Sequence, residues 1–302
     1  MQHYTENFQI QIYHFKTINM PELAELKLTS DYVNTCSEGA TYTRVEKNTQ
    51  HKGTDLDIPF KYFSIKSESK GKEIVLIIKD EDSKDFIPIR ITMGMSGHFQ
   101  LTNTGQEPKH AHLKFYRKDG TTLSFVDVRR FGKWTQGVAW NEDRGPDPTS
   151  DFDAFFLNIM TNLTKRTFRK PLYEVLMDQK WFNGIGNYLR AEIVFRAEDV
   201  DPFLPAAQQI AKYPKILELC RDIPMLAYTK GGGSIRDWDN PFGENALQEK
   251  FMLCYGNKTM ETRIDSKKRR FWYDPKWDVS IHRDDLKDWD YYSGLPSPAA
   301  YK

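Results

Sequence analysis

The sequence predicts an α+β protein, with a β-sandwich in the first half of the chain and helices in the second. Between residues 41 and 138, eight short runs rich in β-branched and aromatic residues alternate with polar or glycine-containing turns. Many short strands at close spacing are typical of a sandwich or barrel. After residue 150 the apolar residues recur at helical spacing instead. A helix is predicted before the strands, and a basic β-hairpin after the helices.

The elements are predicted in order from these patterns. A short amphipathic helix runs from Pro21 to about residue 36. Residues 141–148 are rich in Asp, Pro and Gly and predict a linker or long loop. Ser150 or Asp151 can cap the helix that follows. The predicted strands are 41–45, 60–66, 73–79, 88–93, 98–101, 112–116, 121–127 and 133–138, and the predicted later helices are 151–163, 170–178, 187–196, 208–220 and 245–254.

Composition limits the classes of function. The 302 residues are 39% hydrophobic and 28% charged, as expected for a globular protein with a large core. The net charge is +1, so any nucleic-acid binding must come from local basic patches. The three cysteines are widely spaced, which argues against a disulfide framework and a four-cysteine zinc site. No apolar run is long enough to span a membrane, and residues 1–19 do not resemble a signal peptide, so an intracellular location is expected.

The stretch Met20-Pro21-Glu22-Leu23-Ala24-Glu25 holds the candidate nucleophile. If Met20 is the start of translation and is trimmed, Pro21 carries a free secondary amine with a pKa near 8. Such an amine can attack a sugar C1′ carbon and form a Schiff base. Glu22 and Glu25 would then handle the protons. The alternative is an ordinary helix start, with proline in the first turn and acidic residues beside the helix dipole.

Further candidates contact phosphate or fill space in DNA. Asn187 follows the turn Gly184-Ile185-Gly186, so it is predicted to cap the next helix and to form a phosphate clamp with the free N–H groups there. Lys72 lies at the mouth of a strand, where it can contact phosphate and assist proton transfer. His110 and His112 alternate on a strand, so they share one face and can touch a phosphate. For each, the alternative is a structural or solvated side chain.

Two loops carry side chains suited to entering a base stack. Asp127-Val128-Arg129-Arg130-Phe131-Gly132 places guanidinium groups and an aromatic ring at a strand end. Met95, within Met93-Gly94-Met95-Ser96-Gly97, can fill the gap left by a flipped nucleotide. The alternative is a core Met and Phe with solvated arginines.

The hairpin at 257–273 carries six Lys or Arg side chains and two acidic ones, which is a reasonable phosphate-binding footprint.

These motifs, in this order, resemble the formamidopyrimidine-DNA glycosylase / endonuclease VIII family. The resemblance covers nearly everything from Met20 to about Tyr273. Its anchors are Pro21-Glu22-Leu23-Ala24-Glu25, Gly71-Lys72, Met93-Gly94-Met95-Ser96-Gly97, Asp127-Val128-Arg129-Arg130-Phe131-Gly132, Asp178-Gln179 followed by Gly184-Ile185-Gly186-Asn187-Tyr188, and Gly231-Gly232-Gly233-Ser234-Ile235-Arg236-Asp237.

The resemblance implies a β-sandwich joined to a helix-two-turns-helix domain, with damaged DNA between them. Pro21 would be the nucleophile, Glu22 the acid that assists base release, and Glu25 a residue that positions the sugar. Lys72 matches the family's lysine required for base excision. The resemblance also assigns the DNA contacts, with Asn187 on a phosphate beside the lesion and the gap-filling residues Met95, Arg129 and Phe131. It implies base excision followed by β- and δ-elimination.

The sequence departs from the common family pattern in two places. Cys254-Tyr255-Gly256 begins the region of the family's zinc finger, but no Cys-x-x-Cys pair follows. The basic hairpin therefore resembles the "zincless finger" of some endonuclease VIII-like members, and neither a metal nor another cofactor is expected. Arg269 best matches the finger arginine that grips phosphates, with Arg270 as the close rival. The second departure is the extension 1–19, an upstream mis-start or a removable segment.

The predicted division is a catalytic β-sandwich at 20–145, a DNA-binding helical domain at 150–254, a finger at 255–275 and a tail at 276–302. A monomer acting on damaged DNA is expected, in the nucleus if the source is eukaryotic and in the cytoplasm otherwise. The Phe131 loop favours oxidised purines, whereas the missing zinc motif favours oxidised pyrimidines and ring-opened purines, and we favour the latter. The alternative is a catalytically silent DNA-binding module, if residues 1–20 remain attached.

Overall fold

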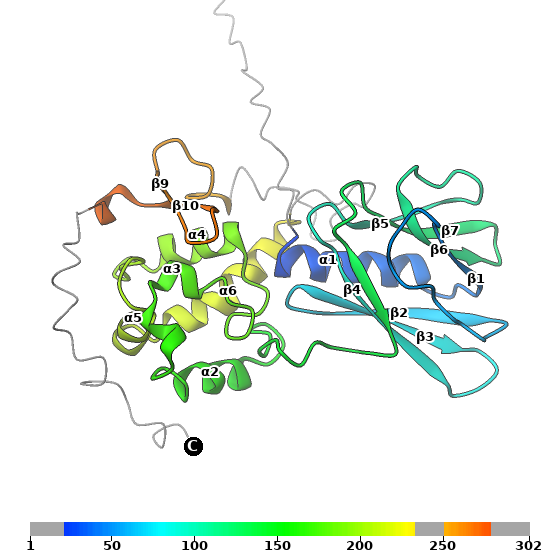
Figure 1. The fold of residues 1–302 in the computed structure, drawn as a ribbon, viewed down its shortest axis with the longest axis horizontal. Helices are drawn as coiled ribbons and strands as arrows, with labels where there is room; N and C mark the ends of the chain where they lie inside the picture. The colour runs from blue at the N-terminus through cyan, green and yellow to red at the C-terminus, as the bar shows by residue number, and fades with distance from the viewer. Residues whose placement is uncertain (1–20, 233–250, 279–302) are drawn as a thin grey trace, which may run out of the picture.

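The computed structural model of the chain describes residues 21–232 and 251–278 (Figure 1). The first eight strands gather in one half of the molecule, the later helices and the β9–β10 hairpin lie in the other, and helix α1 lies between them. The helices are α1 Leu23–Ser37, α2 Phe152–Met160, α3 Leu172–Val175, α4 Asn187–Arg196, α5 Ala206–Lys212 and α6 Ile216–Thr229, with 3-10 turns η1 Arg166–Arg169 and η3 Pro275–Trp277. The strands are β1 Tyr42–Lys47, β2 Phe63–Lys70, β3 Glu73–Asp80, β4 Phe86–Thr92, β5 His98–Asn103, β6 Ala111–Arg117, β7 Thr121–Val126, β8 Lys133–Gln136, β9 Glu261–Ile264 and β10 Arg270–Tyr273.

The first eight strands form the predicted β-sandwich. Their order is β5-β7-β6-β1-β2-β3-β4-β8, and the named neighbours pair antiparallel. Strands β1 and β2 meet at one residue pair, Tyr42 with Phe63, whereas β2 and β3 pair along their whole length. The sheet thus divides at β1–β2 into two four-stranded layers. All eight predicted strands are confirmed, with ends shifted by a few residues.

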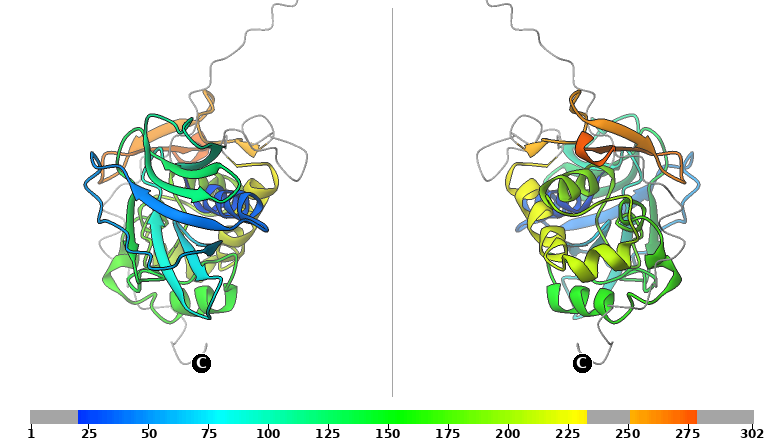
Figure 2. Two further views of the ribbon diagram at one scale, coloured as in Figure 1. Left: turned by 90° about the vertical axis from the view of Figure 1, so that its right-hand side faces the viewer. Right: turned by 90° about the vertical axis from the view of Figure 1, so that its left-hand side faces the viewer.

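Two hydrophobic cores share helix α1. Leu26 and Val33 belong to a core made with the strands, because alternate residues of β2, β3 and β7 point to the same interior. Leu23 and Ala24, one turn earlier, belong to the core of the helices. Figure 2 shows the two ends of the molecule, with strands in front in one view and helices in front in the other. The first turn of α1 therefore lies where the two cores meet.

The β9–β10 hairpin packs against the helices through its aromatic side chains. Phe271 stacks on Tyr173 with ring centroids 4.9 Å apart, and Tyr273 meets Phe203 edge-on at 4.8 Å. Phe271 and Tyr273 are buried in the helical core. The hairpin is thus fixed to α3 and the segment before α5 by ring packing, while strand β9 stays exposed.

Several sequence-based helix boundaries are wrong. The helix expected at 208–220 is two helices, because Pro214 has no N–H to donate and restricts the residue before it, so α5 ends at Lys212. The helix expected at 170–178 is only one turn, α3, after Pro171. Most of the helix expected at 245–254, and most of the motif at 231–237, lie outside the described residues. Within the described ranges, no helix is both long and apolar enough to cross a membrane.

Candidate active site

Glu22 directs its carboxylate from the start of α1 into the start of α4. Its Oε1 accepts a hydrogen bond from the Tyr188 N–H at 3.0 Å, and its Oε2 accepts one from the Leu189 N–H at 3.2 Å. These N–H groups have no partner within a helix, and the helix dipole favours a negative charge beside them. The side chain is 1% exposed. A residue next to Pro21 is therefore fixed to a helix 166 positions later in the sequence.

This contact corrects one prediction. The N–H groups at the start of α4 bind the carboxylate of Glu22 and not a phosphate. Asn187 does not cap the helix either, because Gly186 is the capping residue and Asn187 is the first helical one. The Asn187 side chain instead donates to the backbone carbonyl of Arg270 at 2.9 Å. A phosphate contact of Asn187 stays a prediction.

Glu25 organises the same turn of α1. Its Oε2 accepts the backbone N–H of Glu22 at 2.9 Å, and the Tyr188 hydroxyl donates to its carboxylate at 2.9 Å. Burial first, and then the neighbouring carboxylates, raise the pKa of Tyr188 well above its ordinary value, so this hydroxyl keeps its proton. Tyr188 was not among the predicted site residues, although it directly follows Asn187 in the motif. The two acidic residues of the Pro21 stretch therefore both bond to α4.

Lys72 joins the site from the turn between β2 and β3. A Cβ atom placed on Gly186 would lie 2.1 Å from Cδ of Glu22 and 2.4 Å from Nζ of Lys72. The carboxylate and the ammonium group therefore occupy the space where a side chain of residue 186 would be. This explains why glycine is required here, since the backbone of Gly186 is extended and would accept any residue.

The turn that carries Lys72 is held by the linker and by the loop before α4. The Gly71 N–H donates to Oδ2 of buried Asp147 at 2.6 Å. Gly71 has φ +57°, and a Cβ atom there would lie 1.9 Å from the side-chain oxygen of Asn183. Asn183 in turn donates to the carbonyl of Gly145 at 2.9 Å. The predicted linker thus fixes the position of Lys72.

The electrostatics of the pair suit proton transfer near neutral pH. Burial raises the pKa of Glu22 to about 7, although Lys72 and the two N–H groups oppose the rise and Glu25 adds to it. Burial also lowers the pKa of Lys72, with Arg144 and Arg269 adding to the effect and Glu22 opposing it. An acid whose pKa is close to the working pH can both hold and release a proton. Perturbed groups of this kind cluster at functional sites.

Arg269 approaches this site from the hairpin. Its Nε donates to Oδ2 of Asp265 at 2.7 Å, and its backbone N–H donates to Oδ1 of Asp265 at 2.8 Å. Its charge is close enough to lower the pKa of Lys72. Arg270, the rival, is exposed and lies 5.9 Å from the ring centre of Trp272. The geometry favours Arg269 as the arginine that faces the site.

The two predicted gap-filling loops lie against each other. The carboxylate of Asp127 accepts the hydroxyl of Ser96, the Gly132 N–H at 2.7 Å and the Arg129 N–H at 3.2 Å. Gly94 packs on the backbone between Phe131 and Gly132, where a Cβ atom would lie 2.7 Å from main-chain atoms. The loop of Met95 is therefore fixed beside the loop of Arg129 and Phe131.

Phe131 is an exposed aromatic side chain of this pair of loops, with 54% of its surface accessible. The Arg129 guanidinium lies 5.2 Å from the centre of its ring. His110 also belongs to this region, since its backbone carbonyl accepts the Asp127 N–H at 3.0 Å. His112 is buried, and its Nε2 bonds to the Asp127 carbonyl at 2.8 Å, so the two histidines do not share one exposed face.

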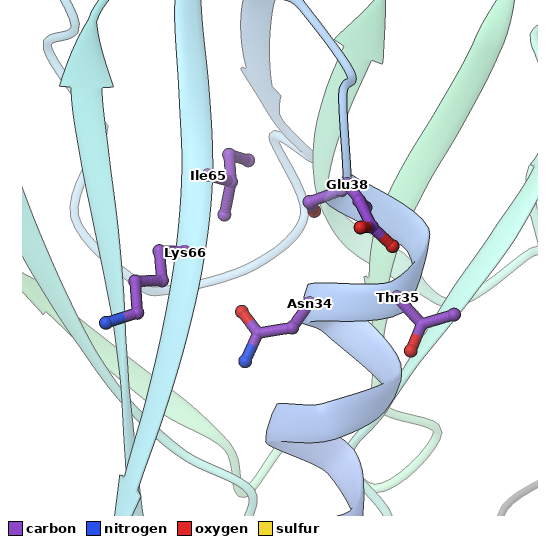
Figure 3. A pocket seen from close by; sticks show the side chains of 6 residues that line it. Asn34, Thr35, Glu38, Ile65 and Lys66 are labelled. Atoms are coloured by element: carbon purple, nitrogen blue, oxygen red, sulfur yellow. The ribbon is translucent and has the colours of Figure 1, made fainter. Parts of the chain in front are cut away.

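A separate pocket with a volume of about 360 Å³ lies at the opposite end of α1 (Figure 3). Its residues are Asn34, Thr35, Ser37, Glu38, Ile65 and Lys66. The side-chain amide of Asn34 donates to the backbone carbonyl of Ser67 at 3.0 Å and accepts a hydrogen bond from the Ser67 N–H at 2.7 Å. At 1.5 Å per helical residue, Glu22 is roughly 20 Å away, so this pocket has no part in the site. Within residues 21–232 and 251–278, no three His, Cys, Asp or Glu side chains form a metal site.

Comparisons with known proteins point to one family. The formamidopyrimidine-DNA glycosylase N-terminal domain matches residues 20–134. Endonuclease 8-like 1 of Homo sapiens is 33% identical over 285 residues, which cover 84% of this chain and 72% of that protein. The chain belongs to the formamidopyrimidine-DNA glycosylase / endonuclease VIII family. Endonuclease 8-like 1 of Mus musculus matches to the same extent.

Solved structures of the family share the fold. The MutM (Fpg) protein from Thermus thermophilus superposes with a TM-score of 0.67 at 22% identity, covering 85% of this chain and 98% of that one. Lactococcus lactis Fpg, in complex with DNA containing an N7-benzyl-Fapy-dG, gives a TM-score of 0.69 at 20% identity, covering 85% and 99%. Family membership and fold are thus confirmed, and the role of each site residue stays a proposal.

Proposed function

We propose that this member of the family removes oxidised bases from damaged DNA through a Schiff base at Pro21. The chain is a base-excision-repair DNA glycosylase, and abasic-site lyase activity fits its family. The observation that carries the mechanism is the buried Glu22 carboxylate, which adjoins Pro21 in sequence, lies beside Lys72 and has a pKa raised to about 7.

The reaction requires a free Pro21 amine. Its nitrogen attacks C1′ of the damaged nucleotide, the bond from C1′ to the base breaks, and the departing base takes up a proton. Protonated Glu22 supplies a proton for base release and sugar opening, and Lys72 assists from the lesion side. The nitrogen lone pair then forms an iminium at C1′. Loss of a C2′ proton expels the 3′ phosphate, δ-elimination expels the 5′ phosphate, and hydrolysis frees Pro21.

The remaining site residues hold the DNA in this proposal. Asn187 and Arg269 bind phosphates beside the lesion, and His110 and Arg270 extend this contact. Met95, Arg129 and Phe131 occupy the space that the flipped nucleotide leaves. The exposed Phe131 ring and the neighbouring Arg129 guanidinium suit this role, because an apolar wedge can enter a base step.

The substrate class follows the endonuclease VIII-like relatives. We propose oxidised pyrimidines and ring-opened purines as the preferred lesions, because two relatives at 33% identity are named endonuclease 8-like 1. The second candidate is a preference for 8-oxoguanine and formamidopyrimidine. The exposed Phe131 loop favours it, as does the similarity to a formamidopyrimidine-DNA glycosylase of Streptococcus pneumoniae, which is 32% identical over 174 residues.

The active form in this proposal begins at Pro21 and is a monomer in the compartment that holds DNA. The domain bounds in this proposal are 20–145, 150–254 and 255–275, and the presence of two hydrophobic cores supports the division between the first two. With residues 1–20 retained, the Pro21 nitrogen lies in a peptide bond and the protein would only bind DNA.

Incision of defined lesions tests the proposal. Protein that begins at Pro21 is mixed with duplexes carrying one oxidised pyrimidine, one ring-opened purine, one 8-oxoguanine or no damage. We expect the first two to be cut fastest, with phosphate on both new ends. Protein that retains residues 1–20 is the matched control and should bind without cutting. If protein starting at Pro21 cuts none of the damaged strands, the enzymatic proposal is wrong.

A further inference from the structure

Two proposed phosphate contacts, Asn187 and Arg269, lie on different elements but share one buried ion pair. Asn187 begins α4, and Arg269 directly precedes β10. Between them, Nη1 of Arg190 lies 3.0 Å from Oδ2 of Asp265, and both side chains are fully buried. Burying two charges is costly, so such a pair adds little net stability. What it determines is the geometry of the groups bonded to it.

On the helix side, the pair orients the amide of Asn187. Nη2 of Arg190 donates to Oδ1 of Asn187 at 2.6 Å. A guanidinium can only donate, so it requires the oxygen of the amide on its own side. The nitrogen must then face the hairpin, where it donates to the Arg270 carbonyl at 2.9 Å. Arg190 thus decides which end of Asn187 is offered to an anion.

On the hairpin side, the pair orients Arg269. Both oxygens of Asp265 hold this residue, one through its backbone N–H and the other through Nε. Because the guanidinium is planar, fixing Nε restricts the directions in which its two Nη groups can point. Burial alone would raise the pKa of Asp265, but the bonds from Arg269 and Arg190 outweigh it and lower the pKa. Asp265 therefore stays ionised and keeps both bonds.

Other contacts attach the hairpin and the segment just before it to the helices. Glu192 accepts the N–H groups of Leu253, Cys254 and Tyr255 at 2.8–3.1 Å. Glu174 accepts the backbone N–H of Ser266 at 3.2 Å and its hydroxyl at 2.7 Å. The contacts of the Arg190–Asp265 pair to Asn187 and Arg269 are therefore additional to those that attach the hairpin.

We propose that Arg190 and Asp265 are positioning residues, which hold Asn187 and Arg269 in register as one phosphate clamp across α4 and the hairpin. This inference rests on the proposed DNA-binding roles of Asn187 and Arg269. It predicts a change in DNA affinity opposite to the change expected from charge alone. Removing a negative charge near DNA by itself strengthens binding, because less phosphate repulsion remains. Asp265→Asn should instead weaken binding, because Arg269 loses its orientation.

A double-mutant cycle on DNA affinity tests the inference. Protein beginning at Pro21 is titrated onto a duplex with a tetrahydrofuran abasic analogue, which cannot be cleaved. Asp265→Asn and Arg269→Gln should each raise Kd about 10-fold, as expected for a lost charged hydrogen bond. The double variant should stay within about threefold of Arg269→Gln, because coupled sites are not additive. In Asp265→Asn, the slope of log Kd against log salt concentration should decrease by the amount expected for the loss of about one phosphate contact.

Arg196→Lys is the matched control. Arg196 is a partly buried arginine on the same helix that reaches the Phe251 carbonyl but neither Asn187 nor Arg269. Its Kd should stay within about twofold of the parent protein. Thermal unfolding of each variant checks that it is folded. If Asp265→Asn does not fold, the cycle of Arg190→Lys with Asn187→Ala replaces it, with the same expectation of coupling.

Two outcomes overturn the inference. One is an Asp265→Asn protein that binds as tightly as the parent or tighter. The other is a double variant whose Kd rises by the product of the single effects. A parent protein that does not prefer the abasic analogue over undamaged duplex contradicts the proposed function itself, and the inference falls with it. If the parent protein prefers the analogue but the two substitutions change Kd independently, only the inference is contradicted.

Discussion

At the scale of single residues, Glu22 carries the chemistry because of where its neighbours lie. It adjoins Pro21, accepts two N–H groups of α4 and lies beside Lys72. Burial raises its pKa to about 7, so near neutral pH it exists in both protonation states. The sequence indicated an acid here, but the burial that gives it this pKa depends on α4, which is distant in sequence.

The pH dependence of base release should report Glu22. We expect a bell-shaped pH profile for the rate of base release, because the Pro21 amine, with a pKa near 8, must lose its proton to attack and Glu22, with a pKa of about 7, must keep the proton that it donates. Glu22→Gln should lower this rate by roughly 10²–10⁴-fold and remove the limb of the profile that depends on Glu22. Single-turnover kinetics on a lesion duplex between pH 5 and 9 measure both effects. An unchanged pH profile in the variant would refute the role of Glu22.

The same group links stability to pH. The folded-state pKa of Glu22 lies above its ordinary value of 4.5. Between these two values the folded protein binds more protons than the unfolded chain, so Glu22 lowers the free energy of unfolding as pH rises from 4.5 to about 7. Relative to Glu22→Gln, the parent protein should lose up to about 1.4 kcal/mol per pH unit in this window. Urea unfolding of both proteins at several pH values measures the difference, and a constant difference would contradict the assignment.

At the scale of elements, the sequence correctly predicted where α4 begins but not which groups bond to its first N–H groups. The glycines correctly indicated a tight turn, and the helix was expected at its observed position. The N–H groups at its start were assigned to phosphate, whereas Glu22 occupies them. Arg190 would be read from sequence as a surface residue. One signal was present, since Arg190 and Glu192 interrupt a helix whose other residues are largely apolar.

Gly186→Ala tests this element. The added methyl group would overlap the carboxylate of Glu22 and the ammonium of Lys72, so both must move. We expect base excision to slow by at least about 10-fold, since small misplacements in an active site cost up to 10²-fold. Gly120→Ala is the control, because it meets open space at φ +86° and should cost only about 1 kcal/mol of stability. Equal activity of the Gly186→Ala protein and this control would show that the close approach is unimportant.

At the scale of the whole molecule, local patterns predicted the strands, the first helix and the order of the motifs. They could not predict how α1 serves two cores, with Leu23 in one and Leu26 in the other. Nor could they predict that Asp147 of the linker holds the turn of Lys72, because that bond spans 76 positions. Candidate residues are therefore found from sequence, whereas their bonding partners depend on long-range packing. The site forms only when both cores are in place.

The central claim is that Pro21 is the nucleophile and must be the first residue. Borohydride reduction during reaction with abasic-site DNA, followed by mass spectrometry of the adduct, tests it most directly. Protein that begins at Pro21 should form a stable adduct at that nitrogen, and protein with residues 1–20 retained should not form it there. An adduct on a lysine such as Lys72, or no adduct with an intact protein that binds the DNA, would contradict the claim.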